Sequence, residues 1–173
     1  VGSFNHNSGS VTLTGGSHGA YSFYNLTIGG TVTATGNWTI GRNWTNSGTF
    51  IPGAYTVIFT GAVTHAISGA TNFNSLSDTV GGSTLTFTAG ETFGVAGALT
   101  LTGSGGSLIT VQSSSGGSTW SLNNTGTNSV SFVSVSDSPA TTPSVTAADS
   151  QDLTGNNTNW NFGVVTWTGT TST

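Results

Sequence analysis

Acidic side chains near the C-terminal end are the residues of this sequence best placed to do chemistry. Asp149 and Asp152 lie in the segment ADSQD, and Asp137 precedes them. Spaced carboxylates could bind a hard cation through oxygen ligands, or act as the pair of acids that a glycosidase needs. Isolated acids in loops more often cap turns by accepting backbone hydrogen bonds. We therefore expect turn caps, and we assign no catalytic, cofactor-binding or metal-binding residue.

Histidines are the other side chains that could ligate a metal. His18 and His65 follow the similar segments VTLTG and VIFTG, so a repeating fold could bring them onto one face. His6 lies in a polar N-terminal segment, and the three together form no local metal-binding motif. We expect loop residues that recur with the repeat. No serine stands beside a recognisable base and orienting group, so we assign no nucleophile and expect no enzymatic activity.

Tryptophan and asparagine could mediate contacts with sugars. Flat aromatic rings suit sugar rings, but core packing is the commoner use of tryptophan, and Trp167 is the one that we expect outside the core. Five Asn-x-Ser/Thr sequons occur, a number that chance explains in a sequence so rich in these residues. Glycans are therefore an alternative partner, without a predicted attachment site.

The composition restricts the partners of this chain. Only 3% of the 173 residues are charged, Arg42 is the single cation, and the net charge is -4. Such a chain has no basic surface for nucleic acid or an anionic membrane, and no apolar run of about 18 residues for membrane insertion. It has neither Cys nor Met, the most easily oxidised residues. We expect an extracellular or cell-surface protein, secreted after removal of a leader, that uses no cofactor.

Short strands are predicted throughout the chain. Threonine alternates with Val, Ile, Leu, Phe or Trp over about three to six residues, which places the apolar side chains on one face of a strand. Gly, Asn and Pro separate these segments, most clearly between Phe23 and Gly61. No amphipathic helix is visible, so the fold class is all-β.

Internal similarity suggests how the strands are arranged. VTLTG (11–15) resembles VIFTG (57–61), FYNL (23–26) resembles FNSL (73–76), and GGTVTATG (29–36) resembles GGSTLTFTAG (81–90). These spacings predict a unit of about 50 residues that makes two turns of a solenoid, with about three strands per turn. We predict a parallel β-helix of about seven turns. The alternative is an antiparallel β-sandwich or jelly roll, which commonly uses Asn-Gly or Asp-Gly hairpin turns that this chain lacks.

Two segments, FYNLTIGGTVTATGNWTIGRNWTNSGTF and DSQDLTGNNTNWNF, resemble repeats of large secreted and cell-surface bacterial proteins. The resemblance implies a right-handed parallel β-helix and a role as adhesin, stalk or surface-layer material, with fibre formation. Other parallel β-helix proteins are polysaccharide lyases or hydrolases, so the fold alone does not decide the function.

We divide the chain into an N-terminal arm or cap (1–10), a β-solenoid domain (11–162) and a C-terminal strand or tail (163–173). The tail alternates like a strand and is predicted to pair with a neighbouring subunit through Val164, Val165, Thr166, Trp167 and Thr168. The expected function is a structural subunit of an extracellular filament, a homopolymer of solenoids joined head to tail. Alternatives are a monomeric adhesin or glycan-binding module, and a polysaccharide-degrading enzyme that uses the three acids.

Overall fold

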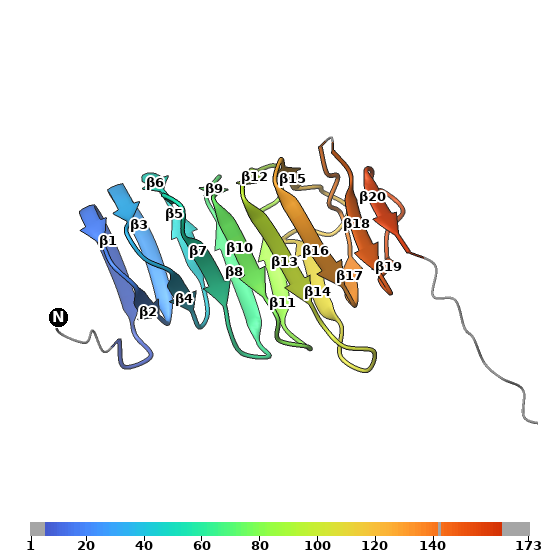
Figure 1. Ribbon diagram of the computed structural model, residues 1–173, viewed down its shortest axis with the longest axis horizontal. Helices are drawn as coiled ribbons and strands as arrows, with labels where there is room; N and C mark the ends of the chain where they lie inside the picture. The colour runs from blue at the N-terminus through green and yellow to red at the C-terminus, as the bar shows by residue number, and fades with distance from the viewer. Residues whose placement is uncertain (1–5, 142, 164–173) are drawn as a thin grey trace, which may run out of the picture.

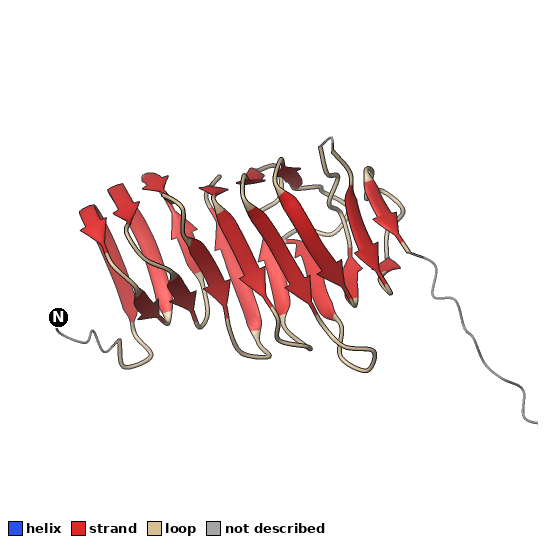
Figure 2. Cartoon of the chain, in the orientation of Figure 1, coloured by secondary structure: helices blue, strands red, loops and turns tan. Residues whose placement is uncertain are grey.

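The fold was determined from a computed structural model that describes residues 6–141 and 143–163. This part of the chain contains β-strands and no helix, and the strands stack one behind another along a single axis (Figures 1 and 2). Every pairing between these strands is parallel. The molecule is a parallel β-solenoid, which confirms the predicted fold class over the antiparallel alternative.

Three parallel sheets run along the solenoid axis. Sheet A follows the order β1 (Ser10–His18), β3 (Asn25–Ala34), β5 (Trp44–Asn46), β8 (Thr64–Ser68), β11 (Thr84–Phe87), β14 (Ile109–Ser113), β17 (Val133–Val135) and β19 (Gln151–Asp152), and β6 (Thr49–Ile51) also pairs with β3. Sheet B follows β2 (Tyr21–Phe23), β4 (Trp38–Ile40), β7 (Thr56–Phe59), β10 (Ser75–Asp78), β13 (Ala98–Thr102), β16 (Thr127–Ser131), β18 (Val145–Ala148) and β20 (Trp160–Phe162). Sheet C contains only β9 (Asn72–Phe73), β12 (Thr92–Val95) and β15 (Ser121–Asn124).

The described residues make eight coils, since sheet B has eight strands in chain order, against the seven or so expected. Each coil passes through sheet A and then sheet B. Coils 4, 5 and 6 pass through a strand of sheet C between the two. The first two coils therefore use two sheets, and the middle ones use three.

Coil length is not constant along the solenoid. Residue 10 pairs with residue 25 in the first coil, whereas residue 93 pairs with residue 122 in the middle, so a middle coil takes many more residues. Near the C-terminal end the coil is as short as the first one, because residue 145 pairs with residue 160. The two-turn unit of about 50 residues predicted from the internal similarity does not align the coils: VTLT lies in sheet A and VIF in sheet B. Of the three similar pairs, only GGTVTATG and GGSTLTFTAG both enter sheet A.

Three corners consist of one residue each, which the sequence pattern does not reveal. Tyr24 separates β2 from β3, Asn74 separates β9 from β10, and Phe132 separates β16 from β17. Phe132 adopts a φ of 52°, a left-handed conformation that turns the chain within one residue. The sequence predicts one continuous strand across each of these corners, over 23–28, 73–76 and 130–135, although the inward-facing residues on either side, such as Phe23 and Leu26, are three positions apart and not two.

Inward-facing apolar side chains fill the solenoid, and the largest fully buried ones include Trp38, Trp44 and Trp120. The aromatic rings form clusters and not one ladder along the axis. In the first cluster Trp44 lies 4.9 Å from Phe50 between ring centroids, and in a later one Phe87 stacks on Trp120 at 3.8 Å. Rings pack both within a coil, as Trp44 and Phe50 do, and between successive coils, as Phe87 and Trp120 do.

Candidate functional site: the ends of the solenoid

Two of the three acids singled out in the sequence, Asp137 and Asp152, accept hydrogen bonds from neighbouring backbone and side-chain groups. Asp137 is buried, and its carboxylate accepts hydrogen bonds from the backbone N–H of Gly117 (3.1 Å) and the side-chain amide of Asn156 (2.7 Å). Asp152 accepts from the backbone N–H of Gly155 at 2.9 Å. Asp149 is exposed at a turn with a φ of 50°. In the described part of the chain no three His, Cys, Asp or Glu residues are grouped as metal ligands.

The structure separates the two histidines that the sequence placed at like positions. His18 ends β1 in the first coil, where its Nε2 lies 2.9 Å from the carbonyl oxygen of Gly15. His65 lies in β8 of the fourth coil and is fully buried, with Nδ1 2.7 Å from the carbonyl oxygen of Arg42. Each imidazole ring contacts a different backbone carbonyl oxygen, so the two histidines do not form a shared metal site.

Asp78 is a buried acid that sequence reasoning missed. It ends β10 and points into the core, where its carboxylate accepts hydrogen bonds from the Ser83 hydroxyl (2.7 Å) and the Val80 backbone N–H (2.9 Å). Burial raises the pKa of Asp78, although these two hydrogen bonds and the nearby His65 partly oppose the rise in pKa. The carboxylate has no exposed surface. We interpret it as the polar anchor of a tight corner, which no motif in SLSD indicates.

Tryptophans and sequon asparagines also have structural uses. Trp38, Trp44, Trp120 and Trp160 are all buried, so these four offer no exposed platform for sugar rings. Sequon asparagines hold neighbouring coils together: the side-chain oxygen of Asn37 accepts from Thr56 N–H at 3.0 Å. Likewise, Asn43 accepts from Ala66, and Asn123 accepts from Thr141.

At its ends sheet A stops at β1 and β19, whose outer edges pair with no other described strand. Sheet A runs from β1 to β19 and sheet B from β2 to β20, so each sheet stops at a strand with one neighbour among the described residues. No helix covers either end within residues 6–141 and 143–163, and none there could span a membrane. Unpaired strand edges are templates for pairing with another chain.

Apolar side chains accompany the open edge of the first coil. Val11 and Leu13 are only partly buried, whereas their partners one coil further in, Leu26 and Ile28, are 1% and 0% exposed. At the other end Phe162 is partly buried and Leu153 is 56% exposed. A further coil placed on either end would bury these side chains, as the second coil buries part of the first.

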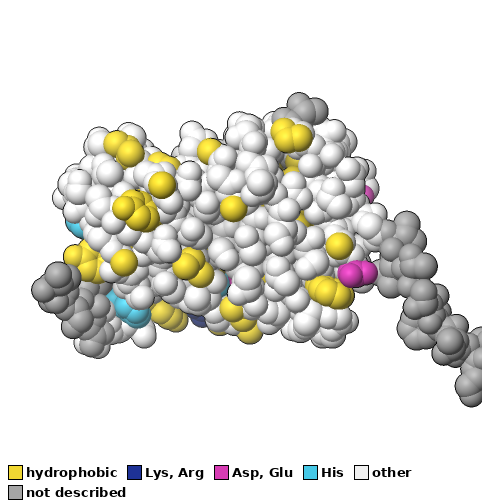
Figure 3. Space-filling view, in the orientation of Figure 1, with side chains coloured by type: hydrophobic (Ala, Val, Ile, Leu, Met, Phe, Trp, Pro, Cys, Tyr) yellow, Lys and Arg dark blue, Asp and Glu magenta, His cyan; other side chains and the backbone are white. Residues whose placement is uncertain are grey.

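Charge is scarce on the surface. Figure 3 shows a face of uncharged polar atoms with scattered hydrophobic side chains and few charges. No charged residue precedes Arg42, so the first coil carries none. Sheet B has no charged outward-facing side chain in the described residues, because Asp78, its single acid, points inward. Contacts at the N-terminal end would therefore meet little electrostatic repulsion.

The interface predicted in the tail, Val164 to Thr168, lies outside the described residues. Comparison with protein-family models, with curated proteins and with solved structures found no match to this chain.

Proposed function

We propose that this chain is a structural subunit of an extracellular or cell-surface filament, in which solenoids stack head to tail. The observation that carries the proposal is the contrast between the first two coils. The same inward positions are partly exposed in the first coil and buried in the second, so among the described residues the first coil is a core face that no further layer covers.

The coils at the two ends have the same spacing, which favours a second copy of this chain as the next layer, although the terminal strand of sheet A is nine residues long in β1 and two in β19. Both ends present one strand of sheet A and one of sheet B. Ser10 pairs with Asn25 at one end and Val145 pairs with Trp160 at the other, so the two terminal coils have the same length, and the solenoid widens only between them. A contact between two different ends of the same molecule is heterologous and can propagate into a filament.

Stacking would gain both hydrogen bonds and apolar burial. Parallel pairing would satisfy the open edge of β1. Full burial of partly buried side chains such as Leu13 would contribute roughly 1 kcal/mol each. Strand donation by Val164, Val165, Thr166, Trp167 and Thr168 would be an additional link and is proposed from the sequence alone. An adhesin-like role on a bacterial surface rests likewise on the sequence resemblance.

A charge placed on the N-terminal end tests the proposal. A lysine at position 13 can lay its methylene stem on the apolar end and keep its ammonium in solvent, so Leu13→Lys should fold. In a stacked contact that ammonium would be buried without a partner, which is strongly unfavourable. Thr100→Lys is the matched control, because it adds the same charge to the outward face of sheet B.

Negative-stain microscopy and light scattering should show rods that lengthen with concentration for the parent chain and for Thr100→Lys. Leu13→Lys should stay at the length of one subunit. A parent chain that remains monomeric at every concentration would rule out the filament, and rods formed equally by Leu13→Lys would rule out this end as the contact.

A further inference from the structure

Sheet C is an elaboration that the solenoid does not require. The first two coils close with sheets A and B alone, whereas coils 4 to 6 each insert a strand of a third sheet. These inserted strands, β9, β12 and β15, lie in the middle of the rod (Figure 1). Any surface on sheet C therefore stays accessible if the two ends are covered.

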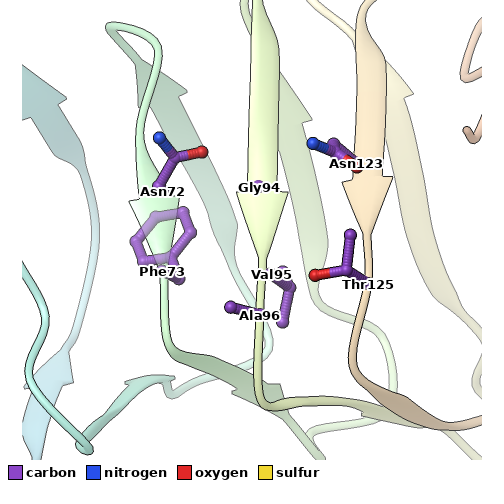
Figure 4. Close-up of a pocket in the computed structure, with 7 residues that line it drawn as sticks. All are labelled: Asn72, Phe73, Gly94, Val95, Ala96, Asn123 and Thr125. Atoms are coloured by element: carbon purple, nitrogen blue, oxygen red, sulfur yellow. The ribbon is translucent and has the colours of Figure 1, made fainter.

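A small hollow opens on the outward side of sheet C, with a volume of about 100 Å³. Gly94 of β12 pairs with Asn72 of β9 on one side and with Asn123 of β15 on the other. The glycine thus lies between two asparagine side chains that share its register (Figure 4). A Cβ atom at Gly94 would lie only 2.2 Å from Oδ1 of Asn72, so any side chain there would close the hollow.

The two amides present opposite hydrogen-bonding groups across this glycine. Asn123 Oδ1 accepts a hydrogen bond from the Thr141 hydroxyl (2.9 Å), which turns the Asn123 amide nitrogen towards Gly94 (Figure 4). Asn72 is exposed and makes no side-chain hydrogen bond within the described residues, and its Oδ1 is directed towards Gly94. The hollow therefore offers a donor and an acceptor that face one another.

The remaining lining decides the class of ligand. The exposed Ala96 supplies apolar surface, Thr125 supplies a hydroxyl, and no charged residue lines the hollow. An anionic ligand would find no cation here, and a cationic ligand no carboxylate. A sugar hydroxyl both donates and accepts, so one hydroxyl could donate to Asn72 Oδ1 and accept from the Asn123 amide.

We propose that the Asn72–Gly94–Asn123 hollow is a binding subsite for a neutral saccharide. It holds part of one sugar ring, since it is smaller than the cavities of roughly 300 to 1,000 Å³ that enclose whole small molecules. Binding at a single hollow is accordingly weak. The saccharide enters from the side of the rod, so binding does not depend on head-to-tail assembly.

The test is frontal affinity chromatography on the immobilised full chain, a format that works for monomers and polymers alike. The probes are maltohexaose, cellohexaose, mannohexaose and chitohexaose, with oligogalacturonate as the anionic comparison. Asn72→Ala removes the acceptor without breaking a hydrogen bond of the protein, so its thermal unfolding should match that of the parent chain. Gly94→Ala fills the hollow by displacing the Asn72 amide. Asn161→Ala, an exposed asparagine on sheet B, is the control.

At least one neutral probe should be retained by the parent chain and by Asn161→Ala. Asn72→Ala and Gly94→Ala should each weaken that retention about fivefold or more, the loss expected for one neutral hydrogen bond. The inference is overturned if no neutral probe is retained, if Asn72→Ala retains the probe as well as the parent, or if only oligogalacturonate binds.

Discussion

Close contact between successive coils predicts that Gly126 cannot be replaced by alanine without loss of stability. A Cβ atom built at Gly126 would lie 1.9 Å from the carbonyl oxygen of Gly97 on the neighbouring coil. That atom belongs to the backbone, so it cannot swing aside as a side chain could. On both sides of Gly126 the coils are joined by hydrogen bonds, from Thr127 N–H to Gly97 O (2.8 Å) and from Thr125 N–H to Val95 O (3.0 Å).

The size of the effect follows from these contacts. An added methyl group must either stay compressed, at about 1 to 3 kcal/mol, or part the coils and weaken both hydrogen bonds, at about 1 kcal/mol each. Alanine also lowers the conformational entropy of the unfolded chain, which stabilises the folded state by about 0.4 to 1 kcal/mol. We therefore expect Gly126→Ala to lower the free energy of unfolding by about 2 kcal/mol.

Gly116→Ala is the matched control, because its Cβ would have no neighbour within 4 Å and its φ is not in the left-handed region. This substitution should leave stability unchanged or raise it by up to about 1 kcal/mol. Urea unfolding followed by tryptophan fluorescence should place the Gly126→Ala midpoint about 1 M below the parent, given a slope near 2 kcal/mol per M. Equal midpoints for the two variants would show that the coils are not packed as tightly as the structure requires.

Two further outcomes are expected. The raised pKa of Asp78 means that the folded chain holds this proton more tightly than the unfolded chain does, so its contribution to stability falls as pH rises from the ordinary carboxyl pKa through the raised one. Asp78→Asn should remove this pH-dependent loss of stability, and the variant should be at least as stable as the parent at neutral pH. Urea midpoints of the parent and the variant that change in parallel with pH would contradict this prediction. Deleting residues 163–173 should shorten or abolish rods in negative-stain images if the tail donates a strand, and unchanged rods would limit assembly to the solenoid ends.

Alternation along the sequence predicted the strands well because a solenoid uses the simplest rule of a sheet, apolar in and hydroxyl out. The segment TVIF of β7 and the segment TLTF of β11 both show it, with every second side chain buried. The corners between strands were harder to predict from the sequence. A single residue such as Tyr24 or Phe132 turns the chain and changes the spacing of the buried residues only once, from two positions to three, so neighbouring strands of different sheets were predicted as one strand.

Register between coils explains the remaining differences. Coils of different length bring together residues that no constant spacing relates, so Asn72 and Asn123 share one position with Gly94 although the sequence separates them. One signal was present: Gly94 interrupts the strand TFGV, and a glycine inside a strand often marks a close approach to other groups. The buried carboxylate of Asp78 had no such signal, since SLSD is also typical of an exposed turn.

Assembly and sugar binding, if both proposals hold, would reinforce each other through the geometry of the rod. The proposed contact lies at the ends, whereas the hollow lies on sheet C in coils 4 to 6, so each stacked subunit would add one accessible hollow along the side. Weak sites repeated along a stiff rod bind a surface much more tightly than one site does, because later contacts form at a high effective concentration.

This reasoning predicts a difference between soluble and immobilised sugar. Leu13→Lys, which blocks stacking, should bind a soluble neutral oligosaccharide as well as the parent chain does, because the hollow is unchanged. On a surface coated with the corresponding polysaccharide, the parent should dissociate at least about tenfold more slowly than Leu13→Lys. Asn72→Ala should weaken binding in both formats, by about fivefold or more for the soluble sugar, while still forming rods. Equal dissociation of the parent and Leu13→Lys from the coated surface would show that the rod does not use its hollows together.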